Sequence, residues 1–141
     1  MASKEEKNID EQFKQRVKQM YIHRNSKYGQ FIIQTNIVQH YLFLLILRII
    51  IQRKSLINKK LIKYLEESTL GNLINCFRIC ADSSDGLSLA DDLEFYNNKR
   101  NALAHKMCSK NELKITDCVS SIELGDKLLI KLKQLIEIIK K

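Results

Sequence analysis

The chain has 141 residues, of which 45% are apolar, which predicts one folded domain over residues 1–141 and argues against an intrinsically disordered protein. It contains no proline and only four glycines, too few for the many turns of a sheet protein, so we expect an all-α fold. The formal charge of +8 favours binding to polyanions such as RNA, although a lysine-rich surface also keeps a protein dissolved.

The first half of the chain predicts two helices. Apolar residues at a 3.6-residue spacing indicate a first helix from about residue 4 to residue 24. The segment NSKYGQ, residues 25–30, interrupts the pattern, and a second helix is expected from about residue 30 to residue 52. The second helix is apolar on most of its faces, so more than one neighbour must cover it.

Residues 31–51, FIIQTNIVQHYLFLLILRIII, are the most apolar part of the chain. A membrane-spanning helix needs about twenty nearly uninterrupted apolar residues, but polar side chains interrupt this segment and Arg48 lies in its second half. We therefore expect no membrane span but a central helix covered by the bundle or by a partner subunit, with His40 as a core or interface histidine. The N-terminal MASKEEKNIDEQ lacks the apolar core of a signal peptide, which predicts a cytoplasmic protein.

The second half predicts shorter helices and a long closing one. The basic segment 53–68 fits a short amphipathic helix, and Ser68 or Thr69 is expected to cap the helix in STLGNLINCFRICA. The run DSSDG predicts a loop, after which Ser88 and Asp91 fit a capping box for a helix from about residue 89 to residue 108. A loop then leads to a last helix from about residue 118 to the C-terminus. The expected architecture is a four- to five-helix antiparallel bundle.

The cysteines do not form an ordinary zinc pattern. Cys76, Cys80, Cys108 and His105 are the residues from which such a site could be imagined, but zinc ligands usually come in close Cys-x-x-Cys pairs. We expect these thiols and that of Cys118 to be reduced and buried, and we expect no metal and no other cofactor.

The segment KRNALAHKM, residues 99–107, carries side chains suited to phosphate chemistry on a predicted helix. Asn101 and His105 are four residues apart and share one face, and the long side chain of Arg100 can reach the same rim. Imidazole exchanges protons near neutral pH, and guanidinium matches phosphate oxygens. Such a set can cleave RNA without a metal, through attack of the ribose 2′-hydroxyl on the adjacent phosphate. The alternative is a structural histidine on a half-buried helix.

Acidic side chains precede this segment by one to two helical turns, at Asp91, Asp92 and Glu94. They are candidates for holding a divalent ion or for orienting Arg100. The plainer interpretation is the acidic first turn that helices commonly have.

The segment YNNKRNALAHKM resembles the Arg-polar-x-x-x-His signature of the HEPN superfamily, and the pattern from about Glu67 onward resembles the layout of bacterial HEPN-like proteins. The resemblance implies a helical bundle that forms a homodimer and acts as a metal-independent endoribonuclease, in toxin–antitoxin or anti-phage (abortive-infection) systems. Carried over, Arg100 binds the scissile phosphate, Asn101 helps to position it, and His105 is the acid or base.

The neighbours of this motif bear on its partners. Lys99 and Lys106 flank it and are expected to contact RNA. Met107 stands where HEPN toxins paired with a nucleotidyltransferase often have the tyrosine that this partner modifies. An antitoxin or another defence protein remains the expected protein partner.

The alternative function is a non-catalytic HEPN-like module that binds a protein or nucleic acid within a defence complex, because many HEPN-like domains are silent. A DNA-binding protein is less favoured, since no helix-turn-helix pair is evident.

Overall fold

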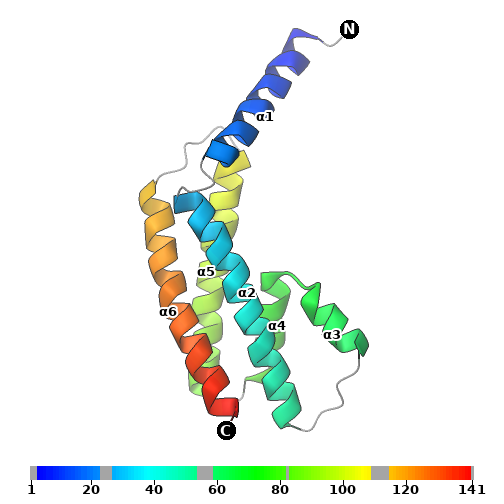
Figure 1. The fold of residues 1–141 in the computed structure, drawn as a ribbon, viewed down its shortest axis with the longest axis vertical. Coiled ribbons are helices and arrows are strands. Elements are labelled where there is room, and N and C mark those ends of the chain that lie inside the picture. Colours follow the sequence, from blue (N-terminus) through cyan, green and yellow to red (C-terminus); the bar gives the residue numbers. More distant parts are fainter. Residues whose placement is uncertain (1–2, 23–26, 54–58, 82, 109–114, 141) are drawn as a thin grey trace.

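The computed structural model describes residues 3–22, 27–53, 59–81, 83–108 and 115–140. Within these ranges the regular structure is entirely helical, which confirms the all-α class there. The helices, shown in Figure 1, are α1 (Lys4–Ile22), α2 (Lys27–Gln52), α3 (Lys59–Glu66), α4 (Leu70–Cys80), α5 (Ser84–Cys108) and α6 (Ile115–Lys140).

Four of the helices, α2, α4, α5 and α6, pack side by side as a bundle (Figure 1). Gln34 bonds to Asp126, and further along both helices Tyr41 lies under the ammonium of Lys133, so α2 and α6 run parallel. Only α5 runs against the other three (Figure 1). The order therefore differs from the antiparallel one expected, because the segment containing α3 returns the chain along the bundle before α4 starts.

The buried face of α2 supplies much of the core. Its buried residues are Phe31, Gln34, Thr35, Val38, Leu42, Leu45 and Ile46. Fully burying a Leu, Val, Ile or Phe side chain stabilises a fold by about 1.5–3 kcal/mol. The opposite face leaves Ile33, Ile37 and Ile51 exposed, so residues 31–51 are partly core and partly open surface. By length and composition alone α2 is also apolar enough to cross a membrane, as the core helix of a water-soluble bundle can be.

The helix starts show which capping predictions hold. The Thr69 hydroxyl accepts a hydrogen bond from the backbone N–H of Asn72 at 3.2 Å, which confirms Thr69 as the N-cap of α4. For α5 the predicted start near residue 89 is wrong. The Ser83 hydroxyl accepts from the backbone N–H of Gly86 at 3.0 Å, so the helix begins at Ser84 and takes up most of the expected DSSDG loop.

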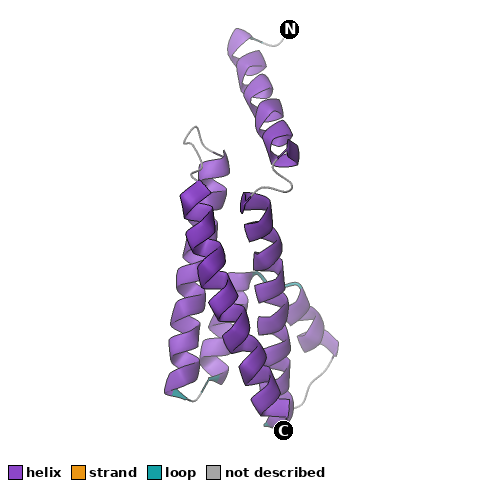
Figure 2. Cartoon of the chain, turned by 60° about the vertical axis from the view of Figure 1, so that its left-hand side comes forward, coloured by secondary structure: helices purple, strands orange, loops and turns teal. Residues whose placement is uncertain are grey.

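The first helix stands apart from the bundle. Figures 1 and 2 show α1 projecting past the end at which α2 begins and α5 ends. Its apolar residues Ile9 and Phe13 are 67% and 63% exposed, as expected for a helix with no neighbour along this part of its length.

Candidate functional site

The Arg-Asn-His segment lies where α5 extends beyond the first turn of its neighbour α4. Gly71, in the first turn of α4, lies against Asn97, because a Cβ atom at Gly71 would be 3.4 Å from the Asn97 amide nitrogen. α5 continues beyond Asn97 for about three further turns, as Figure 1 shows. Asn97, Asn101 and His105 follow one another at four-residue intervals, so they share one face. Asn101 and His105, which lie past the start of α4, are both exposed.

Arg100 occupies a different side of the same helix. It follows Asn97 by three residues, is half-buried, and its guanidinium donates a hydrogen bond to the side-chain oxygen of Asn97 at 3.3 Å. Consecutive helical residues are about 100° apart, so Arg100 lies between the exposed face of Asn101 and the bundle. The structure thus brings Asn101 and His105 together on one face, and Arg100 begins about 100° round the helix from Asn101 but directs its guanidinium to Asn97, which belongs to that face. Asn97 was not among the predicted site residues, although its spacing from Arg100 is that of an interacting helical pair.

Of the two lysines proposed as RNA contacts, the structure describes the side chain of Lys99. Lys99 is exposed, and its ammonium lies over the Phe95 ring at 5.3 Å from the ring centroid. Two residues of a helix span about 200°, so Lys99 and Asn101 lie on opposite sides of α5. The side chain of Lys106 lies outside the described residues.

A buried polar network lies one turn below Arg100. The Tyr96 hydroxyl donates to the side-chain oxygen of Gln34 at 2.9 Å and lies 3.2 Å from the Thr35 hydroxyl. The Gln34 amide nitrogen donates to the Ile122 carbonyl and to the Asp126 carboxylate, both at 2.8 Å. The network therefore joins α2, α5 and α6 at the level from which Arg100 projects, and fixes the helix that carries the motif.

Tyr96 has a structural role, as a buried hydrogen-bond donor. The pKa of Tyr96 is raised to about 12, mainly because the side chain is buried. The hydrogen bond with Thr35 and the charge of Arg100 lower this pKa, and the charge of Asp126 raises it. The phenol consequently stays protonated at neutral pH and keeps donating its hydrogen bond.

The acidic side chains before the motif are engaged in ion pairs. Arg78 of α4 pairs with Asp91 at 2.7 Å and also with Glu94, and Lys131 of α6 pairs with Asp92 at 3.3 Å. These pairs tie α5 to both of its neighbours, while Arg100 is oriented by Asn97. Their role in the described structure is therefore to join helices.

The cysteines behave as separate thiols. Cys118 is buried as expected, whereas Cys76 and Cys80 are only half-buried, and the side chain of Cys108 lies outside the described residues. Burial raises the pKa of the Cys118 thiol, and the charge of Asp117 adds to this. In the part of the chain that the structure describes, no three His, Cys, Asp or Glu side chains gather closely enough to hold a metal ion.

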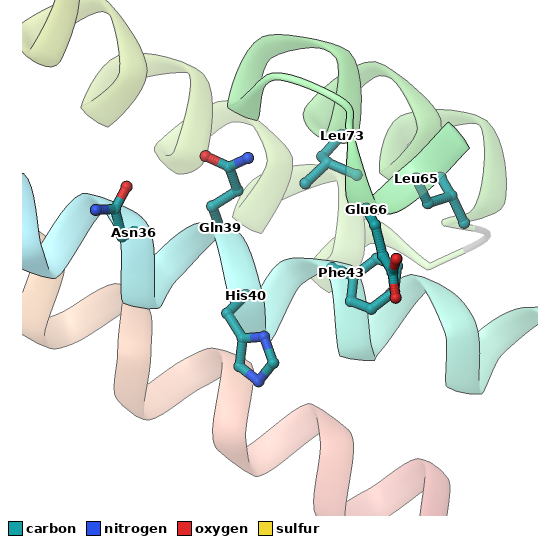
Figure 3. Close-up of a pocket in the computed structure, with 7 residues that line it drawn as sticks. All are labelled: Asn36, Gln39, His40, Phe43, Leu65, Glu66 and Leu73. Atoms are coloured by element: carbon teal, nitrogen blue, oxygen red, sulfur yellow. The ribbon is translucent and has the colours of Figure 1, made fainter. Parts of the chain in front are cut away.

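A pocket of about 310 Å³ lies between α2, α3 and α4 (Figure 3). Its lining residues are Asn36, Gln39, His40, Phe43, Leu65, Glu66 and Leu73. His40 is exposed, so the expectation of a core histidine is wrong, while an interface role stays a prediction. The polar residues that interrupt the apolar helix were the available signal for this pocket, but their partners come from α3 and α4.

Comparison of the chain with protein-family models finds no match, and comparisons with curated proteins and with solved structures find none either.

Proposed function

We propose that the protein is a metal-independent endoribonuclease of the HEPN type that acts as a homodimer in the cytoplasm. The observation that carries this proposal is the exposure of Asn101 and His105 on one face of α5, with the half-buried Arg100 held beside them by Asn97. A buried histidine would have favoured a structural role. The formal charge of +8 also suits a polyanionic substrate.

The reaction needs two proton transfers and one anion site. The 2′-oxygen attacks phosphorus after losing its proton to a base, and the bond to the 5′-oxygen breaks as that oxygen receives a proton from an acid. The products are a 2′,3′-cyclic phosphate and a 5′-hydroxyl. His105 serves as acid or base, Arg100 binds the phosphate oxygens, and Asn101 helps to hold the phosphate in place.

A two-fold dimer supports this chemistry better than one chain does. One protomer offers one His105, whereas a symmetric pair offers a second imidazole, so that one acts as base and the other as acid. The exposed Ile33 and Ile37 on α2 supply apolar surface for such an interface near the level of the buried network. A role as a toxin or anti-phage effector, with an antitoxin or other defence protein as partner, comes with the HEPN resemblance.

Cleavage assays with matched variants test the proposal. Wild type, Arg100→Ala and His105→Ala are incubated with labelled RNA in EDTA, beside Asn75→Ala, which replaces an exposed asparagine of α4. We expect wild type and Asn75→Ala to leave 2′,3′-cyclic phosphate ends. The other two variants should be slower by about 100-fold or more, since acid–base groups typically contribute 10²–10⁴-fold.

Equal inactivity of all four proteins, with dimers verified and bound inhibitors removed, would overturn the enzyme proposal. It would favour the non-catalytic module that binds a protein or nucleic acid.

A further inference from the structure

The pocket between α2, α3 and α4 has two chemically distinct parts. Phe43, Leu65 and Leu73 give it an apolar surface, while the remaining lining side chains carry amide, imidazole and carboxylate groups (Figure 3). A volume of about 310 Å³ is at the lower end of what small-molecule sites have. A ligand that fits must therefore be small, with apolar faces and a polar edge.

A purine base has this form. Protein sites for single-stranded RNA place unstacked bases against aromatic side chains and bond to the polar edges of the bases. Asn and Gln amides are suited to the paired donor and acceptor of a purine, and a carboxylate accepts from its N–H groups. A free phosphate is less suited, because Glu66 would repel it.

The polar groups of the pocket retain bonding capacity. Gln39 donates one hydrogen bond to the Ser68 carbonyl at 2.8 Å, which fixes its amide and leaves its oxygen free to accept. Within the described residues, Asn36 and the ring nitrogens of His40 have no hydrogen bond of their own. A base edge entering the pocket would thus meet one amide that is held in place and two exposed side chains that are able to bond.

The pocket also lies near the proposed catalytic face. Asn36 follows Thr35, whose hydroxyl is 3.2 Å from that of Tyr96, and Arg100 is one helical turn beyond Tyr96, about 5.4 Å along α5. Asn36, the lining residue nearest to this level, is therefore on the order of 10 Å from Arg100, and the other lining residues of α2 lie farther away because α2 and α5 run in opposite directions (Figure 1). A short stretch of extended single strand can span such a distance. The same helix that supplies Leu65 and Glu66 to the pocket wall also carries exposed lysines able to meet a phosphate backbone, at Lys59, Lys60 and Lys63.

We infer that this pocket binds an unstacked purine of single-stranded RNA next to the phosphate that Arg100 contacts. The inference rests on the proposed ribonuclease function for its substrate, but binding of the base can be measured without cleavage. The pocket then selects where the strand is cut, and the Arg-Asn-His face performs the cut.

The first experiment measures binding in the His105→Ala background, so that the RNA stays intact. Anisotropy of labelled hexauridine is compared with that of a hexamer in which one uridine is replaced by adenosine or guanosine. We expect Asn36→Ala, His40→Ala and Glu66→Gln to weaken purine-containing hexamers about 5- to 30-fold and to leave hexauridine unchanged. Asn75→Ala, an exposed amide outside the pocket, serves as the matched control.

The second experiment maps cleavage sites with the same substitutions in the active protein. The purine preference of the cut sites should fall in the pocket variants, whereas Asn75→Ala should keep both the preference and the cleavage rate of wild type. RNA cleavage with an unchanged site preference, together with equal affinities for all hexamers, would overturn the inference and leave the nuclease intact. Purine-selective binding without any cleavage would overturn the nuclease and support the pocket.

Discussion

The two halves of α5 differ in what covers them. Up to Asn97 the helix lies between α4 and α6, and its acidic side chains pair with Arg78 and Lys131. Beyond Asn97 the neighbouring α4 has not yet begun, and Asn101 and His105 face solvent. Polar residues of one helix thus join helices in the first half and are open to a ligand in the second. The difference arises from the length of α4 and not from any change in α5 itself.

The largest effect is expected in RNA cleavage, which should depend on the second half of α5 and not on the ion pairs of the first half. His105→Ala is expected to slow RNA cleavage by about 100-fold or more while changing the free energy of unfolding by less than about 0.5 kcal/mol, because the side chain is exposed. Arg78→Ala should do the opposite. It removes surface ion pairs, so it should lower the free energy of unfolding slightly and keep cleavage within about twofold. Urea unfolding and a cleavage assay on both variants provide the measurements.

Arg78→Ala would contradict this division if it lost as much activity as His105→Ala while still folded. The covered half of α5 would then take part in catalysis.

The next effect concerns the pH dependence of the buried network that joins α2, α5 and α6. The pKa of Tyr96 is raised to about 12 from about 10, so its stabilising contribution is complete below pH 10 and is lost as the pH rises toward 12. Over this window wild type should lose roughly 2–3 kcal/mol relative to Tyr96→Phe, since one pKa unit corresponds to about 1.4 kcal/mol. Chemical denaturation at several pH values measures the difference. Parallel loss in both proteins would mean that the hydroxyl is not buried.

A smaller effect is expected from filling space beside the same network. A Cβ atom at Gly125 would be 2.0 Å from the Gln34 side-chain oxygen, and Gln34 is held by hydrogen bonds to Tyr96, Ile122 and Asp126. Alanine normally favours a helix interior over glycine by about 1 kcal/mol. Here the displaced hydrogen bonds cost about 1–3 kcal/mol and should outweigh this gain.

We therefore expect Gly125→Ala to lower the free energy of unfolding by about 1 kcal/mol. The double variant Gln34→Ala/Gly125→Ala should be less sensitive to the added methyl group, and thermal unfolding of the single and double variants gives the comparison. A stabilised Gly125→Ala would show that Gln34 moves aside freely.

The smallest effect tests how Arg100 is oriented at the boundary between the halves. Asn97→Ala removes the acceptor that holds the guanidinium, so we expect KM for RNA to rise about three- to tenfold, with kcat nearly unchanged. Asn97→Gln keeps an amide acceptor and adds no negative charge, so it should retain most of the affinity. An equal loss in both variants would argue that Asn97 does not act through Arg100.

Local sequence patterns predicted the elements whose signals are local. The apolar helix α2 follows from composition and spacing, and the Thr69 cap follows from the chemistry of one side chain. The start of α5 did not follow, because Ser83 and Ser88 are both suitable caps, and it is the structure that shows Ser83 accepting from the backbone N–H of Gly86.

The candidate site shows the same limit. The shared face of Asn101 and His105 follows from four-residue spacing, whereas their exposure depends on where α4 starts in space. The Gln34–Tyr96 contact joins residues far apart in the chain, and the pocket takes its walls from three helices. No period in the sequence encodes such pairings, so these features required the structure.

The close approach of Gly125 to Gln34 also has a consequence for related sequences. The two positions share one volume, so a glutamine at position 34 and a side chain larger than hydrogen at position 125 compete for it. In homologues that keep the fold, the two positions are expected to change together, with a smaller residue at 34 wherever 125 gains a side chain. A lineage can therefore replace the hydrogen-bonded contact of Gln34 with α6 by an apolar contact only if both positions are substituted.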